Sequence, residues 1–380
     1  MSELKAAVIG AGFVGRAHVE ALRRLSVPIA GVLGSTPGRT EEVRSLLRLP
    51  RAYASLAELA SDPDVDVVHI CTPNYLHHEQ AASLLRAGKH VMCEKPLAMN
   101  VRESASLIDL SRKLHLVGGV TYNLRYYPLC QEAKALISKG AIGEPRLVHG
   151  GFLQDWLLYP TDWNWRLDQN LGGELRAVSD IGTHWLDLVT WLIGRKVVRL
   201  CGDLATVIPV RKRPHGRVET FQSETSQALD EVPITTDDYA SVLLHFENGV
   251  RGAMKVSQVS AGRKAQLSFE INGSEGSLAW NSESPNELWI GSRKEASRVL
   301  PKDPSLMTAD ARGYSAYPGG HQEGYPDTFV QLYKDFYTYL RAGDLDASRS
   351  FPTFETGHEE LVLCDAILQS SREERWVPLP

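Results

Sequence analysis

The sequence predicts an α/β fold with two domains: an N-terminal domain built on a parallel sheet, and a C-terminal α+β domain built on a large, open-faced, mainly antiparallel sheet. The chain has 380 residues, which exceeds the roughly 250–300 residues at which one hydrophobic core stops growing. Strand and helix patterns alternate up to residue 124, as in βαβ units, and beyond it strand patterns follow one another through short turns. We therefore predict domains at residues 1–124 and 125–380.

Short apolar runs in the N-terminal half are typical of strands buried in a parallel sheet. Helical patterns separate these runs at the spacing of βαβ crossovers. We predict strands at residues 4–9, 29–33, 65–71, 90–93 and 116–120, and helices that end at residue 24 or span 41–47, 77–87 and 101–114.

Apolar and polar residues alternate in several runs of the C-terminal half, which indicates strands with one buried face. These runs cover residues 146–153, 239–246, 250–259 and 266–271. Asn248-Gly249 lies between two of them and predicts a hairpin turn. An amphipathic helix is predicted at residues 181–193 and a closing helix near 359–370, whereas 211–236 and 301–326 carry no periodic apolar pattern and are expected to be long loops.

The composition argues against several classes of protein. A net charge of −5 gives no general attraction to nucleic acid or to an anionic membrane surface, and the basic run Arg211-Lys212-Arg213 is expected to be a solvated loop. The five cysteines contain no CxxC pair, so neither a disulfide framework nor a zinc ribbon is indicated. The sequence shows no leader peptide and no apolar run near the roughly 20 residues of a membrane span. We expect a soluble, cytoplasmic protein.

Gly10, Gly12 and Gly15 form a G-x-G-x-x-G motif directly between the first predicted strand and the first predicted helix. In this position the first glycine permits a tight turn, the second lets the backbone approach a pyrophosphate, and the third lets helix and strand pack closely. The helix then begins at Phe13 and Val14, where backbone N–H groups face the phosphates. The motif predicts a dinucleotide-binding site.

The choice between NAD and NADP depends on the residues about 20 positions further on, where an NAD site normally has an acidic residue for the ribose 2′-hydroxyl. Here the segment 33–39 has no carboxylate, and Ser35, Thr36 and Arg39 would suit a 2′-phosphate. This favours NADP slightly. NAD stays open, because hydroxyls and backbone groups also bind it.

Three further segments occur in the order typical of one enzyme family: Cys71-Thr72-Pro73-Asn74 with His77, then Glu94-Lys95-Pro96, then Asp180 with His184. Together with the glycine motif they make the whole chain resemble the Gfo/Idh/MocA family of sugar and inositol oxidoreductases. The resemblance implies an N-terminal Rossmann domain that binds NAD or NADP, a cis Lys95–Pro96 bond and no metal site. It also implies cofactor contacts from Thr72, Pro73, Asn74, His77, Glu94 and Lys95.

Lys95, Asp180 and His184 are the predicted catalytic residues. Lys95 follows a parallel strand, at the carboxyl end where open α/β sheets bind ligands, and it would hydrogen-bond the reacting oxygen. Asp180 and His184 are four residues apart on a predicted helix and share a face. Removing a hydroxyl proton needs a base with a pKa near neutrality, which histidine provides. We assign the base to His184 with Asp180 orienting it; proton transfer to Lys95 is the alternative.

Residues 152–166 concentrate aromatic side chains among polar ones, with three of the eight tryptophans between 156 and 165. Aromatic rings suit the C–H faces of a sugar, and the polar groups suit its hydroxyls; the alternative is a subunit interface. The family resemblance adds two residues at the crossing between the domains. The predicted substrate contacts are Tyr122, Asn123, Gln154, Asp155, Trp156, Trp163, Trp165, Arg166, Arg176, Asp180, His184 and His321.

The sequence therefore predicts an NAD(P)-dependent oxidoreductase that transfers a hydride between a sugar-like hydroxyl and the nicotinamide. One alternative is a redox-neutral glycosidase, which would oxidise the sugar transiently, eliminate the aglycone and reduce the ring again. A nucleotide-binding regulator is a second alternative, and the presence of Lys95, Asp180 and His184 argues against it. Because the open face of the C-terminal sheet needs a cover, a homodimer or homotetramer is expected.

Overall fold

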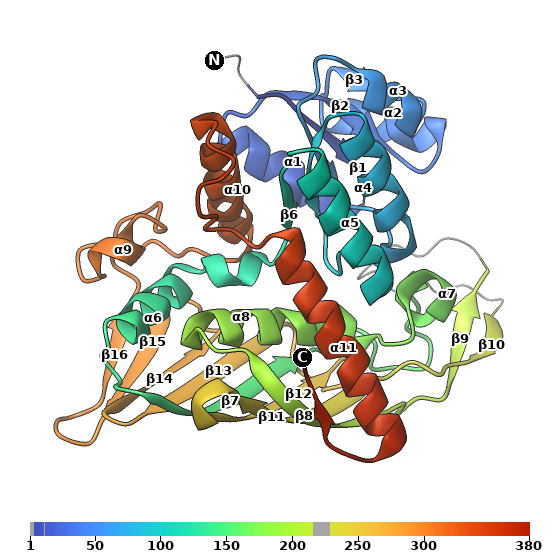
Figure 1. Cartoon of the computed structure of the whole chain (residues 1–380). Helices are drawn as coiled ribbons and strands as arrows, with labels where there is room; N and C mark the ends of the chain where they lie inside the picture. The colour runs from blue at the N-terminus through green and yellow to red at the C-terminus, as the bar shows by residue number, and fades with distance from the viewer. Residues whose placement is uncertain (1–3, 11, 216–228) are drawn as a thin grey trace. The chain divides into compact units, whose positions relative to one another are not determined.

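The computed structural model describes residues 4–10, 12–215 and 229–380 and divides into two compact units (Figure 1). The first unit comprises Met1–Asn123 and Pro326–Leu361, and the second comprises Leu124–Tyr325 and Val362–Pro380. The sequence prediction assigned all of 125–380 to one domain, whereas the structure groups Pro326–Leu361 with the N-terminal unit. Within the described ranges, no helix combines the length and the apolarity that crossing a membrane requires.

The first unit contains a parallel six-stranded sheet. Its strands are β1 (Ala6–Ile9), β2 (Ile29–Leu33), β3 (Arg51–Ala52), β4 (Val67–Ile70), β5 (His90–Cys93) and β6 (Gly118–Val120). They lie in the order β3-β2-β1-β4-β5-β6 and pair in parallel throughout. This is the order of a Rossmann fold, in which ligands bind where the order reverses, outside the carboxyl ends of β1 and β4. The predicted parallel sheet is confirmed; β3 was missed because two residues carry no periodic pattern.

Helices from both ends of the sequence belong to the first unit. They are α1 (Phe13–Arg24), α2 (Pro37–Leu46), α3 (Leu56–Ser61), η1 (Asn74–Leu76), α4 (His77–Arg86), α5 (Val101–Lys113), nearly all of α10 (Tyr325–Ala342) and the first part of α11 (Phe354–Glu373). The sequence predicted α1, α2, α4 and α5 but missed α3 and α10. Helix α11 packs directly on β6, since a Cβ atom at Gly118 would lie 2.5 Å from the Phe354 ring.

The second unit contains a nine-stranded mixed sheet. Its strands are β7 (Pro145–Leu153), β8 (Val197–Ala205), β11 (Tyr239–Phe246), β12 (Arg251–Ser257), β13 (Gln266–Gly273), β14 (Gly276–Asn281), β15 (Glu287–Ser292), β16 (Arg298–Pro301) and β17 (Val377–Pro378). Their order is β16-β15-β14-β13-β7-β12-β11-β8-β17, and β7 pairs with β12 in parallel while the other pairs are antiparallel. The predicted hairpin turn is confirmed, with positive φ at Asn248 (57°) and Gly249 (81°).

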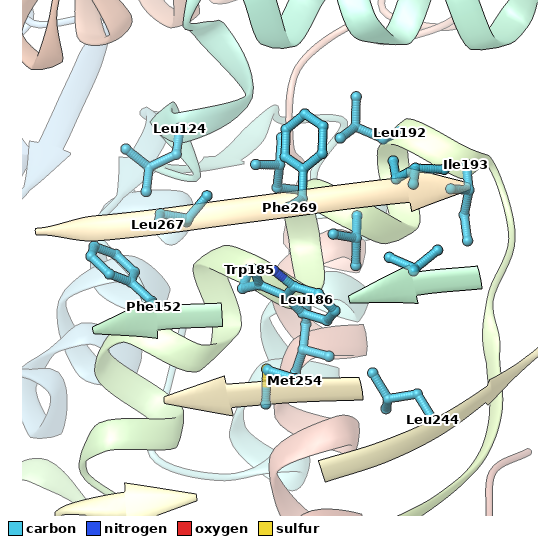
Figure 2. Close-up of a cluster of buried hydrophobic side chains, with 14 of the residues drawn as sticks. Leu124, Phe152, Trp185, Leu186, Leu192, Ile193, Leu244, Met254, Leu267 and Phe269 are labelled. Carbon is cyan, nitrogen blue, oxygen red and sulfur yellow. The ribbon is translucent and has the colours of Figure 1, made fainter. Parts of the chain in front are cut away.

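The second unit also contains helices and helical turns, which are η2 (Asn123–Tyr126), α6 (Pro128–Ser138), η3 (Trp165–Leu167), α7 (Gln169–Gly172), the π-helical turn η4 (Val178–Gly182), α8 (Thr183–Ile193), the hairpin turn η5 (Glu247–Gly249), α9 (Ala309–Arg312) and the rest of α11. Of these, α6, η4 and α8 pack against the sheet. Figure 2 shows Trp185 and Leu186 of α8 among apolar side chains of the strands, and both are fully buried. Burying one such side chain contributes roughly 1.5–3 kcal/mol, so α8 is fixed on the sheet.

The opposite face of the same sheet is open in this chain. Side chains alternate across a strand, and those that face away from α8 include Leu147, Leu243, Trp289 and Val299, which are 37–55% exposed. The open-faced, mainly antiparallel sheet predicted from the sequence is confirmed.

Two segments expected to be long loops differ in outcome. Part of 211–236 forms a hairpin, because β9 (Val210–Pro214) pairs with β10 (Leu229–Pro233), and residues 216–228 lie outside the described residues. The basic run predicted to be a solvated loop belongs to β9; Lys212 and Arg213 are exposed, as expected, but Arg211 is fully buried. Segment 301–326 contains only one short helix before α10, and a buried ion pair of 2.7 Å between Lys302 and Glu323 anchors it.

Candidate active site

The glycine turn lies between β1 and α1, and its three glycines meet different constraints. Gly10 has a φ of +102°, and a Cβ atom there would lie 2.4 Å from the carbonyl oxygen of Cys71. At Gly15 a Cβ would lie 2.0 Å from the carbonyl oxygen of Gly10. At Gly12, by contrast, no described atom lies within 4 Å of a Cβ position. The outer glycines are therefore needed by the fold, whereas Gly12 leaves open space beside the exposed start of α1 at Phe13 and Val14, which fits a pyrophosphate.

The turn after β2 holds the residues predicted to select between NAD and NADP. Thr36 caps α2, since its hydroxyl accepts from the backbone N–H of Arg39 at 3.2 Å. The Arg39 guanidinium is paired with Glu42 at 2.6 Å, and Ser35 is exposed. The Thr36 hydroxyl thus serves as a helix cap, Ser35 is accessible, and the guanidinium of Arg39 already has an acidic partner.

The turns after β4 and β5 are tied together by His77. Its ring nitrogens each lie 2.8 Å from a backbone carbonyl oxygen, one of Thr72 and one of Pro96. The Lys95–Pro96 peptide bond is cis, as the family resemblance implied. Pro73 and Asn74 continue the first turn into η1, where Asn74 is buried. His77 is fully buried, so it fixes the shape of both turns from inside.

Glu94 and Lys95 differ in their surroundings. Glu94 is 9% exposed, and its Oε1 lies 3.0 Å from Nε2 of His18 on α1. Lys95, the next residue, is half-buried. Neither the sequence pattern nor the motif indicated that a histidine would approach Glu94.

Tyr122 and Asn123, predicted to line a pocket, are both buried in the first unit. The side-chain amide of Asn123 donates to the hydroxyl of Thr328 on α10 at 2.6 Å. This bond fixes the end of the segment that follows β6.

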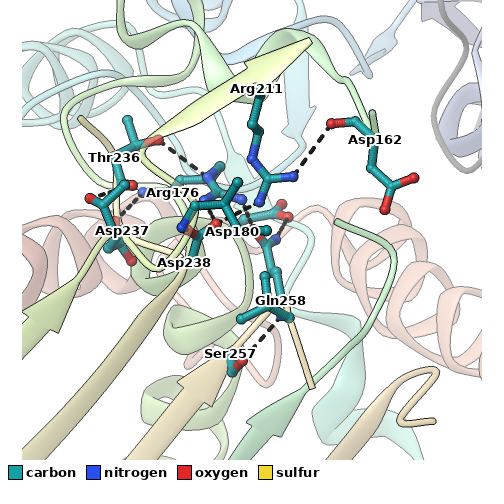
Figure 3. Close-up of polar contacts among 12 residues, drawn as sticks. Asp162, Arg176, Asp180, Arg211, Thr236, Asp237, Asp238, Ser257 and Gln258 are labelled. Carbon is teal, nitrogen blue, oxygen red and sulfur yellow. Dashed lines mark hydrogen bonds and ion pairs between the residues drawn. The ribbon is translucent and has the colours of Figure 1, made fainter. Parts of the chain in front are cut away.

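Asp180 of the second unit is held at both carboxylate oxygens (Figure 3). Oδ1 accepts from Nε of Arg166 at 3.1 Å, and Oδ2 accepts from the side-chain amide of Gln258 at 2.9 Å. Asp180 lies in the π-helical turn that precedes α8, a rare geometry that is frequent at functional sites. His184 follows in the first turn of α8, half-buried, with its ring centroid 6.3 Å from that of Phe152. The structure thus brings Arg166, Asp180 and Gln258 together.

Arg176, also predicted to contact substrate, is only 2% exposed. Its guanidinium donates to Thr236 at 3.2 Å and to Gln258 at 3.0 Å, and it is paired with Asp238. Arg211 of β9 binds the same carboxylate of Asp238 at 2.8 Å (Figure 3). The chain of contacts therefore runs from the β9–β10 hairpin through Gln258 to Asp180.

Asp237 lies beside this chain and accepts from the backbone N–H groups of Arg176 and Val178, at 2.6 and 2.9 Å. Complete burial raises the pKa of the Asp237 carboxyl to about 6, against the opposite effect of these two donors. The carboxyl caps the turn that carries Asp180, so its charge state bears on that turn.

The aromatic segment after β7 presents half-buried rings. The indole N–H of Trp156 donates to Gln154 at 2.9 Å, and the guanidinium of Arg166 lies 4.5 Å from the centroid of the Trp165 ring. Asp155 is paired with Lys264 at 2.8 Å. Trp163 is half-buried with the guanidinium of Arg213 5.8 Å from its ring centroid, and His321 is exposed within its own turn.

Sequence reasoning missed Gln258 and Asp238. Asp238 directly precedes a predicted strand and Gln258 lies at the end of another. Asp238 contacts Arg176 across 62 positions and Gln258 contacts Asp180 across 78, so no local pattern could indicate these contacts. Among the residues that the structure describes, no group of three His, Cys, Asp or Glu side chains is placed to hold a metal ion.

Known proteins resemble both units. Residues 4–122 match the model of the oxidoreductase family with an NAD-binding Rossmann fold, and residues 130–279 match the GFO/IDH/MocA C-terminal domain. Levoglucosan dehydrogenase of Pseudarthrobacter phenanthrenivorans is 30% identical over 100% of this chain and 99% of its own length. Myo-inositol 2-dehydrogenase of Thermotoga maritima is 25% identical over 99% and 98%.

Among solved structures, levoglucosan dehydrogenase in complex with NADH and L-sorbose has a TM-score of 0.90 at 29% identity, covering 100% of both chains. The fold is therefore the same along the whole sequence. Together with the two domain matches and the relative that is 30% identical, this similarity shows that the chain belongs to the Gfo/Idh/MocA family of NAD-binding oxidoreductases.

Proposed function

We propose that the chain is a dehydrogenase that oxidises a hydroxyl of a sugar-like substrate with NAD, or reduces the corresponding carbonyl in the reverse direction. The observation that carries this proposal is the carboxylate of Asp180, which Arg166 and Gln258 hold in place four residues before His184. A fixed carboxylate next to a histidine suits proton removal from an alcohol. The relatives support the substrate class, since they include a levoglucosan dehydrogenase and a myo-inositol 2-dehydrogenase.

In this proposal His184 takes the hydroxyl proton, and the negative charge of Asp180 favours the imidazolium that forms. The ammonium group of Lys95 hydrogen-bonds the substrate oxygen and stabilises its anionic character. The nicotinamide, when bound, supplies the acceptor for the hydride. One proton and one hydride leave the substrate, so an alcohol becomes a carbonyl.

The first unit supplies residues for the cofactor. The open space at Gly12 and the exposed N-terminus of α1 would hold the pyrophosphate. The turns that His77 ties together, which carry Thr72, Pro73, Asn74, Glu94 and Lys95, would follow the nicotinamide half.

We favour NAD over NADP, although the sequence alone favoured NADP slightly. The guanidinium of Arg39 is paired with Glu42 at 2.6 Å, so it offers a 2′-phosphate less than an unpaired arginine would. The carboxylate of Glu42 would also repel a phosphate. The levoglucosan dehydrogenase structure with TM-score 0.90 contains NADH, which agrees with this choice.

The substrate would lie against the aromatic segment that follows β7. The guanidinium of Arg166 lies over the ring of Trp165 and also donates to Asp180. One side chain therefore connects the aromatic surface for the sugar with the carboxylate that we propose to be catalytic. Arg176 is turned to Asp238 and Gln258, and we assign it a positioning role instead of substrate contact.

A second copy of the chain is the proposed partner, because the open sheet face exposes Leu147, Leu243, Trp289 and Val299 and such apolar surface is usually covered. We also propose a cytoplasmic location. All five cysteines carry free thiols, which suits a reducing compartment.

The test is a screen of anhydrosugars, inositols, glycosides and simple sugars with NAD and with NADP, which follows reduced cofactor by absorbance and aglycone release by chromatography. Reduction of NAD in step with loss of substrate supports the proposal. Aglycone release without net NADH formation would instead establish the redox-neutral glycosidase.

Variants then test the assigned residues. Lys95→Ala and His184→Ala should each lower kcat by at least about a hundredfold while NAD affinity stays within a few-fold. Lys294→Ala and His115→Asn are matched controls, because Lys294 is an exposed surface residue paired only with Glu275 and His115 lies in an exposed turn. If His184→Ala retained turnover, the base would have to be assigned elsewhere.

A further inference from the structure

Four buried polar side chains form a line of hydrogen bonds across the first unit. The hydroxyl of Tyr337 on α10 lies 2.9 Å from Nε2 of His69 on β4. Nδ1 of His69 lies 3.0 Å from Nδ1 of His18 on α1, and Nε2 of His18 lies 3.0 Å from Oε1 of Glu94. The first three residues are fully buried and Glu94 is 9% exposed. The proposed reaction uses neither histidine.

The chemistry of each group decides which atom donates. A carboxylate only accepts, so Nε2 of His18 carries a hydrogen and donates to Glu94. With a neutral ring, Nδ1 of His18 then accepts, and Nδ1 of His69 donates to it. Nε2 of His69 must in turn accept from the hydroxyl of Tyr337. With both rings neutral, every donor in the line points towards Glu94.

The environment keeps the line in this state. Burial, with His18 beside it, lowers the pKa of His69 well below its ordinary value. The rings of Phe329 and Tyr333 enclose His18, at centroid distances of 5.5 and 5.1 Å. A line of opposite polarity would need a protonated Glu94 and a different acceptor for the hydroxyl hydrogen of Tyr337, and the described residues supply none.

The line is not a route for protons to water, because it ends at Tyr337, which is fully buried. The other end of the line is the carboxylate of Glu94. Oε1 of Glu94 is held by His18, whereas Oε2 receives no hydrogen bond from the residues that the structure describes. The Glu94 side chain keeps 11% of its surface exposed, so this second oxygen can accept a hydrogen bond from a ligand beside Lys95.

We propose that His18 and His69 are positioning residues that fix the carboxylate of Glu94 so that Oε2 accepts a hydroxyl of the bound cofactor. This inference rests on the proposed NAD-dependent function. A fixed acceptor binds a hydroxyl more tightly than a mobile one because less side-chain freedom is lost on binding.

The first test is independent of activity. In the full chain labelled with 15N-histidine, two-bond proton–nitrogen spectra report which ring nitrogen carries hydrogen. The expected result is a neutral His18 with hydrogen on Nε2 and a neutral His69 with hydrogen on Nδ1, and Tyr337→Phe should disturb the signals of both rings. A charged His18, or one with hydrogen on Nδ1, would overturn the proposal.

The second test is cofactor affinity, measured by NADH fluorescence titration. His18→Leu should raise the Kd by about tenfold, and His18→Gln, whose amide can still donate to Glu94, should recover most of it. In a cycle with Glu94→Gln, the two losses should not add, because both act through one carboxylate.

His90→Leu is the matched control for destabilisation. His90 lies on β5 of the same sheet, where Nδ1 accepts from the backbone N–H of Val117 at 3.0 Å. If His18→Leu and His90→Leu changed Kd equally, the positioning role would be wrong. If the His18 variants do not fold, the NADH titration is made with Tyr337→Phe, which removes only the hydroxyl at the far end of the line. A wild-type chain that binds no NADH would refute the proposed function, while the spectra would still decide the hydrogen positions.

Discussion

The side-chain amide of Gln258 donates to Oδ2 of Asp180 across 2.9 Å, while its oxygen accepts from the buried guanidinium of Arg176 at 3.0 Å. The amide cannot be flipped without placing its NH₂ group against that guanidinium. Arg176 therefore determines which way Gln258 points, and Gln258 determines how Asp180 is held. The carboxylate that we propose to be catalytic is therefore oriented by residues that do not need to touch substrate.

Gln258→Glu is expected to lower kcat/KM by about ten- to a hundredfold, because a second carboxylate would face Asp180. The pH profile should also change, since the pair would share a proton. Steady-state kinetics between about pH 5 and 9 measure both effects. Gln369→Glu, on the exposed end of α11, is the control and should leave the profile unchanged. An unaltered Gln258→Glu enzyme would show that this bond does not bear on catalysis.

Gly12→Ala should separate binding from folding. A methyl group there meets no described atom within 4 Å, so Tm should stay near the wild-type value. NAD affinity should fall by at least about tenfold, because the methyl group would occupy the space of the pyrophosphate. Gly15→Ala, whose Cβ would lie 2.0 Å from a carbonyl oxygen, should instead lower Tm. Calorimetry and NADH titration together distinguish the two variants. Unchanged affinity in Gly12→Ala would mean that the pyrophosphate does not bind beside Gly12.

Asp237 should make stability depend on pH in the direction opposite to most carboxylates. Its pKa in the folded chain is about 6, above its value when unfolded, so its contribution is fully present below about pH 4 and is lost as the pH rises through 6. Asp237→Asn removes this titration. The free energy of unfolding of wild type relative to Asp237→Asn should therefore fall between about pH 4 and 7, by up to about 3 kcal/mol.

Urea unfolding at several pH values measures the Asp237 effect, with Asp346→Asn as the exposed control. A difference that rises with pH would mean that the two backbone donors, from Arg176 and Val178, outweigh burial.

Glu42→Gln should widen cofactor choice. The substitution removes one acidic partner of the Arg39 guanidinium and a negative charge that would repel a 2′-phosphate. The ratio of kcat/KM for NADP to that for NAD should rise by about three- to tenfold. Glu41→Gln is the control, because Glu41 pairs with Arg44 at 2.7 Å on the same helix. Equal effects in both variants would indicate net charge, not the Arg39 pair.

The sequence predicted those helices and strands that have a clear apolar pattern of their own. Strand β5 was predicted with its observed bounds, and α5 within one residue, because each has one strongly apolar face or run. Helix α10 was missed because it is rich in aromatic residues, which have a lower helix propensity than alanine or leucine. Hairpin β9–β10 was missed because its first strand has no alternating apolar residues: the buried positions of β9 are Arg211 and Pro214.

In the candidate site too, some residues could be predicted from sequence motifs and others only from the structure. Gly10, Lys95 and Asp180 could be named as candidates because each belongs to a motif of neighbouring residues in the sequence. The contacts of His18 with Glu94 and of Gln258 with Asp180 join residues 76 and 78 positions apart. Only the folded chain brings these residues together, so their contacts can be recognised only from the hydrogen-bond distances in the structure.

The parallel pairing of β7 with β12 has an evolutionary consequence. Both strands end at the same edge of the sheet, where the backbone N–H of Gln154 donates to the carbonyl oxygen of Ser257 at 2.7 Å. Two stretches that mutate independently thus emerge side by side: one rich in indole rings, the other bearing Gln258. Under the function that we propose, changes in the first stretch alter substrate recognition while Gln258 in the second keeps Asp180 in place, so one scaffold can yield many specificities.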